Sequence, residues 1–334
     1  MKNLSESYNV VIIGSGNIGS RHLQGIAKIK IPINLYVVDN NLSSINLAKK
    51  RFNLAKKNIN IRSINFINSI ERILIRIDLA IIATNANVRK VIIERLIEKN
   101  IVKNLLIEKV CFQSIKDYQS ISRKLEKKNI NSWVNLAKRL FPLYKEINRK
   151  LKNENFFTIN VSSGNFDIGC NTIHLLDILT FLSGSKIKKI DMSLIDKKIL
   201  KSKRKGFIDF KGTLKAKTYR GDELVITNYY DNFSPEILQI ASKNYYFHID
   251  HYNNKVKSYK RINNKIVLQK KYQMKELNQS EMTNVMSQNI LLNNKCELPD
   301  LLESYNIHKP MLAAFLEHIN NFSGKKPVNI CKIT

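Results

Sequence analysis

Residues 10–19 read Val10-Val11-Ile12-Ile13-Gly14-Ser15-Gly16-Asn17-Ile18-Gly19, an apolar run followed by the pattern G-x-G-x-x-G. A short apolar run that ends at a glycine is typical of a buried parallel strand. In the glycine pattern, Gly14 would make the tight turn, Gly16 would let the backbone approach a pyrophosphate, and Gly19 would let the helix pack on the strand. The helix expected over residues 18–28 would direct its N-terminal N–H groups at that pyrophosphate.

A second expected strand, residues 33–38, ends in Asp39, twenty residues beyond the last glycine. A carboxylate at this point can accept hydrogen bonds from both ribose hydroxyls of NAD. Strand, glycines, helix, second strand and acid occur in that order, which a glycine turn without function would not require. The sequence therefore predicts NAD as the cofactor. The residues expected to bind it here are Gly14, Ser15, Gly16, Asn17, Ile18, Gly19 and Asp39.

Length and composition indicate a two-domain globular protein. The chain has 334 residues, of which 43% are hydrophobic and 25% are charged. Its apolar runs are shorter than the roughly 18–20 residues that span a bilayer, and the polar N-terminus does not resemble a signal peptide. The four cysteines (Cys111, Cys170, Cys296 and Cys331) are scattered without the spacing of a metal site. We therefore expect a cytoplasmic protein with no membrane partner and no metal.

The charge of the chain is strongly basic: 56 Lys and Arg against 27 Asp and Glu give a net charge of +29. Such an excess can mark a nucleic-acid or membrane surface. The lysines are spread over the whole chain, however, and its richness in Asn, Ile and Lys is what a biased genome composition would produce. We therefore expect no nucleic-acid partner, although a basic protein can concentrate anionic substrates such as nucleotide sugars.

The pattern of elements changes near residue 130. Up to that point strands and helices alternate, which predicts a doubly wound parallel sheet. The expected elements beyond residue 40 are strands 64–67, 78–83, 105–107 and 133–135 and helices 43–52, 88–99 and 118–128. The remainder predicts an α+β domain with an open, mostly antiparallel sheet. It contains expected strands 156–163, 187–195, 206–214, 224–230, 237–249 and 262–269 and helices 170–182, 281–292 and 301–322. The expected domains are residues 1–130, which bind the dinucleotide, and residues 131–334, which bind substrate and form oligomer contacts.

Four further residues follow strands of the first domain. Thr84 and Asn85 come directly after strand 78–83, and Glu108 and Lys109 come directly after strand 105–107. Ligands of open parallel sheets bind at the carboxyl ends of the strands, so all four are expected to contact the cofactor. Lys109 is the cation placed near the nicotinamide end and can exchange a proton with a substrate hydroxyl. The alternative is a solvated surface lysine.

In the second domain, Asn171, His174 and Asp177 recur at intervals of three residues along one expected helix. Such residues can share a helix face, and a histidine beside an amide can act as a general acid or base near neutral pH. The alternative is a half-buried structural histidine. Arg139 can bind a carboxylate, a phosphate or a carboxamide, or it can be solvated.

Four motifs together resemble the glucose–fructose oxidoreductase / inositol dehydrogenase (Gfo/Idh/MocA) family over almost the full length of the chain. They are residues 14–22 (GSGNIGSRH), Ala83-Thr84-Asn85, Glu108-Lys109 and His174-Leu175-Leu176-Asp177. The resemblance implies an N-terminal Rossmann domain, a C-terminal domain whose open sheet supports substrate binding and oligomer contacts, and NAD(P)-dependent chemistry on sugars, inositols or nucleotide sugars. It implies that Lys109 and His174 are the catalytic residues, because they match the lysine of the family's E-K-P motif and the histidine of its D-x-x-x-H motif.

Two positions depart from these motifs. Val110 replaces the proline of E-K-P, and Cys170 replaces the aspartate four residues before His174. Asn171 is the nearest polar substitute and cannot relay a proton as a carboxylate does. Residues 203–208, together with the sequences around Lys109 and His174, resemble a branch found beside bacterial surface-polysaccharide and nonulosonate-sugar genes.

The expected function is that of an NAD-dependent dehydrogenase or reductase that acts on a CH–OH group of a sugar or nucleotide sugar in cell-surface glycan synthesis. Lys109 and His174 would handle the hydroxyl proton, and Asn171, Arg139 and Asp177 would contact the substrate. The resemblance also implies a homo-oligomer, a dimer or a tetramer. Two alternatives share the fold: a non-catalytic NAD-binding regulator or scaffold, which the loss of a proton relay at Cys170 would favour, and an NAD-assisted glycosidase.

Overall fold

A computed structural model describes residues 7–55, 57–231, 233–324 and 326–334. The chain forms two compact units, Met1–Asn135 with Leu277–Ser304, and Leu136–Glu276 with Tyr305–Thr334. The sequence predicted two domains, each formed by one continuous segment, that meet at residue 130. In the structure, by contrast, Leu277–Ser304 returns to the first unit, and the first unit extends through Asn135.

The first unit is built on a six-stranded parallel sheet with the order β3-β2-β1-β4-β5-β6. Its strands are β1 (Tyr8–Ile13), β2 (Ile33–Val38), β3 (Ile61–Ile67), β4 (Leu79–Ile82), β5 (Asn104–Ile107) and β6 (Asn131–Val134). Its helices are α1 (Asn17–Ile26), α2 (Leu42–Asn53), α3 (Ala86–Lys99), α4 (Ile115–Lys127), α7 (Gln279–Asn293) and the 3-10 turn η1 (Ile70–Arg72). This doubly wound arrangement confirms the fold class expected for this part of the chain.

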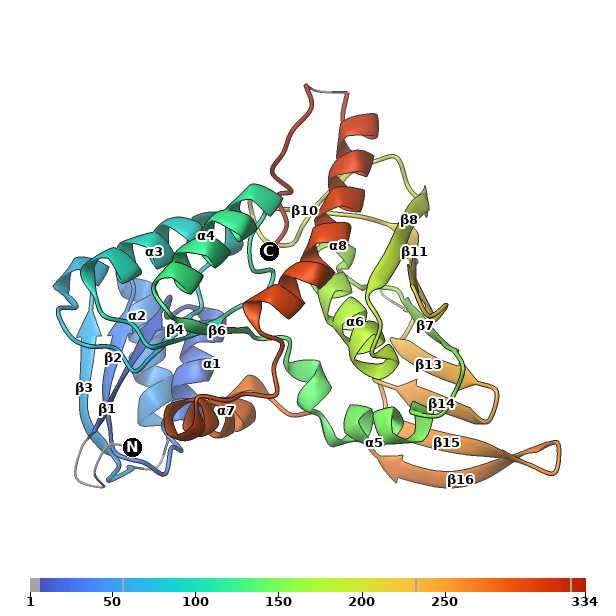
Figure 1. The fold of residues 1–334 in the computed structure, drawn as a ribbon, viewed down its shortest axis with the longest axis horizontal. Helices are drawn as coiled ribbons and strands as arrows, with labels where there is room; N and C mark the ends of the chain where they lie inside the picture. Colours follow the sequence, from blue (N-terminus) through green and yellow to red (C-terminus); the bar gives the residue numbers. More distant parts are fainter. Residues whose placement is uncertain (1–6, 56, 232, 325) are drawn as a thin grey trace. The chain divides into compact units, whose positions relative to one another are not determined.

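The strand order of this sheet explains where its helices lie. The chain runs outward from β1 through β2 to β3, then returns to β4 beside β1 and runs the other way to β6. Because parallel crossovers are right-handed, the two directions place their helices on opposite faces. Figure 1 shows α3 and α4 on one face of the sheet and α1 and α7 on the other. The central strands are therefore buried on both sides, and residues 79–82 of β4 are fully inaccessible to solvent.

The second unit holds an eight-stranded sheet with the order β16-β15-β14-β13-β7-β12-β11-β8. Its strands are β7 (Phe157–Ser163), β8 (Ile187–Ile195), β11 (Gly212–Thr218), β12 (Glu223–Asn228), β13 (Ile237–Ser242), β14 (Tyr245–Asp250), β15 (Lys255–Ile262) and β16 (Lys265–Gln273). A separate ladder joins β9 (Leu200–Lys201) to β10 (Ile208–Asp209). The helical elements are η2 (Ala137–Leu140), α5 (Pro142–Leu151), α6 (Ile168–Ser183) and α8 (Leu301–Phe322), whose first turn belongs to the first unit.

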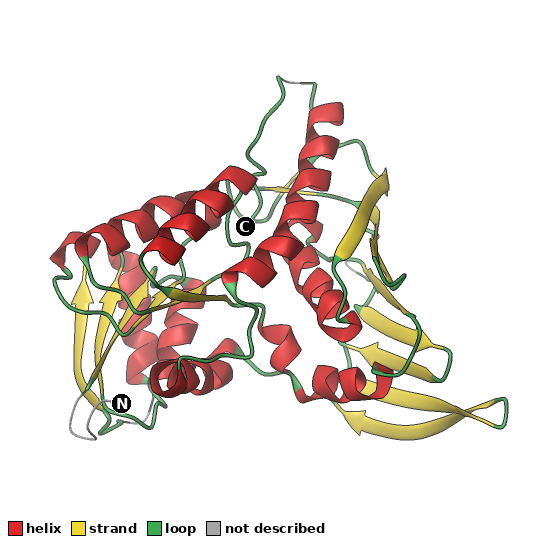
Figure 2. Cartoon of the chain, viewed as in Figure 1, coloured by secondary structure: helices red, strands yellow, loops and turns green. Residues whose placement is uncertain are grey.

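All strand pairs of this sheet are antiparallel except β7 with β12. Along β12 and β14, buried and partly exposed residues alternate, as in a sheet with one covered face. Helix α6 contacts β11 and β12, and Figure 2 shows it along one side of the strands. The mostly antiparallel sheet with packed helices confirms the expected α+β class.

The structure corrects several expected elements. Residues 237–249 were expected as a single strand, but the chain turns after Ser242 and forms the hairpin β13–β14. The expected strand 262–269 falls mostly in β16, which forms a second hairpin with β15. The second turn is made by Asn263 and Asn264, both with positive φ, which is the backbone of a two-residue hairpin loop. The expected strand 206–214 divides into β10 and the start of β11. Helix α5 was missed, although Pro142 stands at its first position and marks a helix start.

None of the helices in the described part of the chain is long and apolar enough to cross a membrane.

Candidate cofactor and active site

The glycine loop after β1 approaches the end of β4 closely. Gly14 has a φ of +89°, and a Cβ there would lie 2.8 Å from the backbone nitrogen of Thr84. A Cβ on Gly19 would lie 1.7 Å from the carbonyl oxygen of Gly14. Both positions therefore require glycine, as the sequence predicted.

The N-terminus of α1 is open to an anion. Its N-cap is Gly16, whose backbone is extended, and no described side chain caps the helix. The first turn contains no acidic residue. The unpaired N–H groups and the positive end of the helix dipole are therefore available to a pyrophosphate.

Asp39 is tied to this loop. One carboxylate oxygen accepts the backbone N–H of Ser15 at 2.7 Å and the Ser15 hydroxyl at 3.2 Å, and the other accepts the N–H of Asn41 at 2.9 Å. Asp39 is partly exposed, whereas Ser15 is buried. These bonds fix the direction of the carboxylate before any ligand arrives. Oδ2 already accepts two hydrogen bonds, whereas Oδ1 accepts one and keeps acceptor capacity for a ribose hydroxyl.

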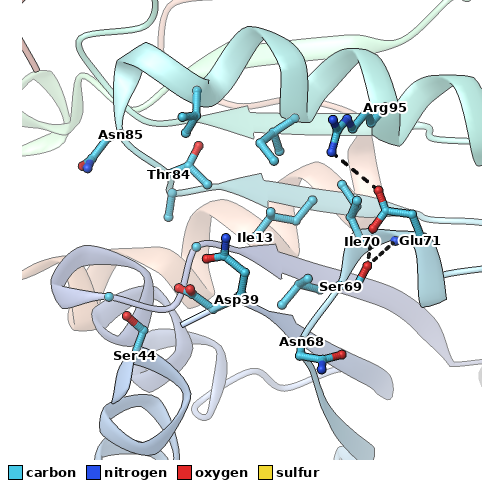
Figure 3. A pocket seen from close by; sticks show the side chains of 17 residues that line it. Ile13, Asp39, Ser44, Asn68, Ser69, Ile70, Glu71, Thr84, Asn85 and Arg95 are labelled. Carbon is cyan, nitrogen blue, oxygen red and sulfur yellow. Dashed lines mark hydrogen bonds and ion pairs between the residues drawn. The ribbon is translucent and has the colours of Figure 1, made fainter. Parts of the chain in front are cut away.

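A cavity of about 460 Å³ opens at the carboxyl ends of β1 to β4. Figure 3 shows Asp39 and Ser44 on one side and Thr84 and Asn85 on the opposite side. The lining residues are Ile13, Gly14, Gly16, Val38, Asp39, Asn40, Ser44, Asn68, Ser69, Ile70, Glu71, Ala83, Thr84, Asn85, Val88, Ile92 and Arg95. An open helix N-terminus, a glycine cradle and a fixed carboxylate meet in one cavity, which fits the pyrophosphate and adenosine ribose of NAD.

The far wall of the cavity was not predicted from the sequence. There the Arg95 guanidinium lies 3.7 Å from the Glu71 carboxylate, and the Ser69 hydroxyl donates a hydrogen bond to Glu71 (Figure 3). Glu71 follows β3 and Arg95 lies on α3. Neither residue belongs to a recognisable motif, so only the strand order of the sheet brings them to the site.

The other expected cofactor residues lie outside the cavity lining. Ser15 is a buried residue of the glycine loop, and Asn17, Ile18 and Gly19 form the first turn of α1. Contact of these four with NAD stays a prediction.

Glu108 is buried directly after β5, with 6% of its surface exposed. Its Oε1 lies 2.9 Å from Nε2 of His22 and also accepts a hydrogen bond from the Asn135 side chain. Burial alone would raise the pKa of this carboxyl, but hydrogen bonds and charges from His22, the bond from Asn135 and the charge of Arg89 lower it below its ordinary value. The Glu108 side chain therefore faces buried protein groups, and its expected contact with the cofactor stays a prediction.

Lys109 is partly exposed at the next position, at the same end of the sheet as the glycine loop. The peptide bond to Val110 is cis. On α3, the buried Arg89 donates hydrogen bonds to the backbone oxygens of Thr84, Val110 and Cys111, the last at 2.9 Å. The backbone on both sides of Lys109 is therefore held in place by buried charged groups.

In the second unit, α6 presents Asn171 and His174, both partly exposed, while Asp177 is buried on the same helix. Nε of Arg139 donates to Oδ2 of Asp177 at 3.0 Å, and a second guanidinium nitrogen donates to Oδ1. The Arg139 guanidinium also lies 5.4 Å from the centre of the Phe181 ring. Arg139 and Asp177 were both expected to contact the substrate, but in the structure their charges pair with each other inside the protein. Direct contact of either residue with a substrate stays a prediction.

A carboxyl that the sequence did not point out lies against the first turn of α6. Asp209, on β10, accepts the backbone N–H groups of Gly169 at 2.7 Å and of Phe210 at 2.9 Å. Burial raises its pKa to about 6 despite these two bonds, and the nearby Asp167 carboxyl adds to the increase. Among the described residues, no three His, Cys, Asp or Glu side chains are grouped so as to hold a metal ion.

Comparison with known proteins agrees with this geometry. Residues 8–136 match the model of the Gfo/Idh/MocA oxidoreductase family with an NAD-binding Rossmann fold. A comparison with curated protein sequences finds no match.

Three solved structures share the fold of nearly the whole chain. An oxidoreductase from Agrobacterium radiobacter, in complex with NAD+, L-tartaric acid and magnesium, has a TM-score of 0.73 at 15% identity, covering 95% of this chain and 97% of its own. UDP-N-acetylglucosamine 3-dehydrogenase from Acidithiobacillus ferrooxidans has a TM-score of 0.71 at 15% identity, covering 96% and 100%. The super-repressor mutant of Gal80p from Saccharomyces cerevisiae has a TM-score of 0.70 at 12% identity, covering 95% and 97%. Residues 8–136 of this chain are therefore similar to the NAD-binding Rossmann domain of the Gfo/Idh/MocA oxidoreductase family.

Proposed function

We propose that this protein is an NAD-dependent oxidoreductase that acts on a CH–OH group of a sugar or a nucleotide sugar. One observation carries the proposal: the glycine cradle, the fixed carboxylate of Asp39 and the turn that bears Lys109 share the carboxyl end of one parallel sheet. When bound, NAD would supply hydride exchange at C4 of its nicotinamide. The UDP-sugar named for the Acidithiobacillus enzyme supports a nucleotide sugar as the substrate class.

Lys109 would hold or release the proton of the reacting hydroxyl, and His174 on α6 would be the second catalytic residue. Asn171, partly exposed three residues before His174, would orient the sugar. The buried pair of Arg139 and Asp177 would hold α6, and thereby His174, in place. A general acid or base placed in this way contributes roughly 10²–10⁴-fold to a rate.

The cellular role and the assembly belong to the same proposal. The resemblance to the surface-polysaccharide branch supports a role in cell-surface glycan synthesis, and the net charge of +29 would attract anionic nucleotide sugars. Exposed apolar residues on the β15–β16 hairpin support a homo-oligomer, because Ile266 and Leu268 keep 65% and 50% of their surface exposed.

The test is a screen of UDP-sugars with NAD+, followed at 340 nm, with NADH affinity measured separately by fluorescence. Lys109→Ala should lower turnover by roughly 10²–10⁴-fold while NADH binding stays within a few-fold. His174→Ala should lose less, because Cys170 removes the carboxylate partner. The matched control is Lys103→Ala, a partly exposed lysine just before β5, at its other end, which should leave turnover unchanged. The proposal fails if the wild type turns over a sugar and Lys109→Ala does so equally well.

A second candidate is a non-catalytic NAD-binding regulator. Cys170 at the position of the motif's aspartate favours it, as does the likeness of the fold to Gal80p, whose name describes a repressor. A regulator would bind NADH, turn over no sugar in the screen and show no change of behaviour in either variant. An NAD-assisted glycosidase would release sugar without a net absorbance change at 340 nm.

A further inference from the structure

A cluster of polar side chains, buried except for the half-buried Gln279, joins four elements of the first unit around Glu108. We call it the Glu108 cluster; its members are His22, Glu108, Asn135, Gln279 and Thr283. His22 lies on α1, Glu108 and Asn135 follow β5 and β6, and the last two lie on α7. His22 and Thr283 are fully buried.

Hydrogen bonds connect the cluster from end to end. Nε2 of His22 lies 2.9 Å from Glu108, and its Nδ1 lies 3.0 Å from the Thr283 hydroxyl. The amide of Asn135 donates to Glu108 and, at 2.8 Å, to Gln279. Gln279 in turn donates to Thr283 at 2.9 Å. The helix that carries the glycine loop, the turn after β5 and the returning helix α7 are thereby linked.

The Glu108 carboxylate at the centre of the cluster is buried in its charged form. An ionised carboxylate is costly to bury unless it is paired and hydrogen-bonded, and here His22 and Asn135 satisfy it while their bonds lower its pKa. A neutral side chain would pack in the same volume without this cost. The charge is therefore retained for something other than packing.

The residue that follows Glu108 is Lys109. On its other side, Arg89 binds the backbone oxygens of Val110 and Cys111. The turn of Lys109 and Val110 is thus held from both sides, by Glu108 bonded to His22 on α1 and to Asn135, and by Arg89 on α3. Buried hydrogen bonds on both sides of a residue restrict the positions that its side chain can take.

We propose that Glu108 is a positioning residue for Lys109: its charge, bonded by His22 and Asn135 and closed off by α7, fixes the amine of Lys109 for proton exchange. The inference rests on the proposed role of Lys109. It assigns α7 a part in the site, since Thr283 and Gln279 bond His22 and Asn135, the two hydrogen-bond partners of Glu108.

The first test measures the placement of Lys109 without any sugar. The full-length protein is labelled with limiting acetic anhydride, and the rate at Lys109 is compared with the rates at other lysines by mass spectrometry. Glu108→Gln should change the relative rate at Lys109 by roughly threefold or more, because the turn is no longer fixed. The control is Asp78→Asn, a carboxylate with 4% exposure that accepts the Asn9 N–H at 2.9 Å at the opposite end of the sheet. It should leave the rate at Lys109 unchanged.

The second test uses turnover. Glu108→Gln should lower kcat with the NADH dissociation constant within a few-fold, and it should have no further effect in the Lys109→Ala background, because residues acting as one unit are not additive. Thr283→Val, which removes only the hydroxyl that closes the cluster, is the second variant if Glu108→Gln folds poorly, and it should shift the Lys109 labelling in the same direction. Unchanged labelling at Lys109 in both variants overturns the inference, as does an equal loss in the Lys109→Ala background. If no sugar is turned over, the proposed function fails while the labelling result still decides the positioning role.

Discussion

Removing the charge of Asp39 should change which dinucleotide the protein prefers. The carboxylate stands at the end of β2 on one side of the cavity (Figure 3). It is held there by hydrogen bonds from Ser15 and Asn41. A ribose whose hydroxyls bond this carboxylate would place the 2′-phosphate of NADPH against the same negative charge. The cation of the cavity wall, Arg95, lies within 3.7 Å of the Glu71 carboxylate, so its charge is already partly offset.

The magnitude follows from the charges. A carboxylate about 4 Å from a phosphate meets a repulsion of order 4 kcal/mol per unit charge pair at an effective dielectric constant near 20. Solvent screening reduces this value, and even half of it, about 2 kcal/mol, is roughly a thirtyfold difference in dissociation constant. The wild type should therefore bind NADH at least about tenfold more tightly than NADPH.

Asp39→Asn keeps the shape of the side chain but loses the charge. Its amide group cannot accept all of the bonds that Ser15 and Asn41 now donate, so both dinucleotides should bind more weakly. The ratio of the two dissociation constants is thus the informative quantity, and it should fall to within roughly threefold. Fluorescence titration with NADH and NADPH measures it, and Asp78→Asn, a buried carboxylate at the opposite end of the sheet, is the control that should leave the ratio unchanged. Equal dissociation constants in the wild type, or an equal change of the ratio in the control, would refute the role of Asp39.

Two further predictions concern stability and are measured by chemical denaturation. Asp209 has its pKa raised to about 6 from an ordinary value of 3.8, so the stability that its protonated form contributes is complete below pH 3.8 and is lost as the pH rises through about 6. Asp209→Asn, which keeps an acceptor for Gly169 and Phe210, should exceed the wild type by on the order of 3 kcal/mol at pH 8 and by little near pH 4; a pH-independent difference would contradict this. Arg139→Leu leaves the Asp177 charge buried and unpaired and should cost about 3–5 kcal/mol, whereas adding Asp177→Leu should recover part of the loss. A double variant less stable than the single one would show that the pair is not the cause.

Local patterns in the sequence were enough to predict the first unit and many element boundaries. Strand β2 and helix α8 lie at their expected residues, because an apolar run between breakers and a long 3.6-residue period are both local signals. The glycine loop was predictable for the same reason. Gly14 needs a positive φ, and Gly19 lies too close to the backbone of Gly14 to carry a side chain. The hairpin β13–β14 was missed although its turn carries a local signal. Three consecutive polar residues, Ser242, Lys243 and Asn244, interrupt the apolar pattern between the two strands, and such clusters favour turns.

Contacts between distant residues were beyond such patterns. His22 and Glu108 are 86 positions apart, and their bond depends on where the sheet places α1 and the end of β5. Sequence reasoning assigned Glu108 to the cofactor because it follows a strand, which fixes the edge of the sheet but not the direction of the side chain. The grouping of Leu277–Ser304 with the first unit has the same origin.

The first turn of α6 shows how a missing motif residue differs from a missing chemical group. The sequence has Cys170 where the family motif places an aspartate, and from the sequence alone this end of the helix has lost its acid. The fold brings the Asp209 carboxyl from β10, 40 positions beyond Gly169, to the backbone N–H of that turn. Its pKa of about 6 lies close enough to neutrality for it to change protonation under physiological conditions. A regulator hypothesis that rests on Cys170 alone is therefore weaker than the motif suggests, because an ionisable carboxyl still contacts the first turn of the helix that carries His174.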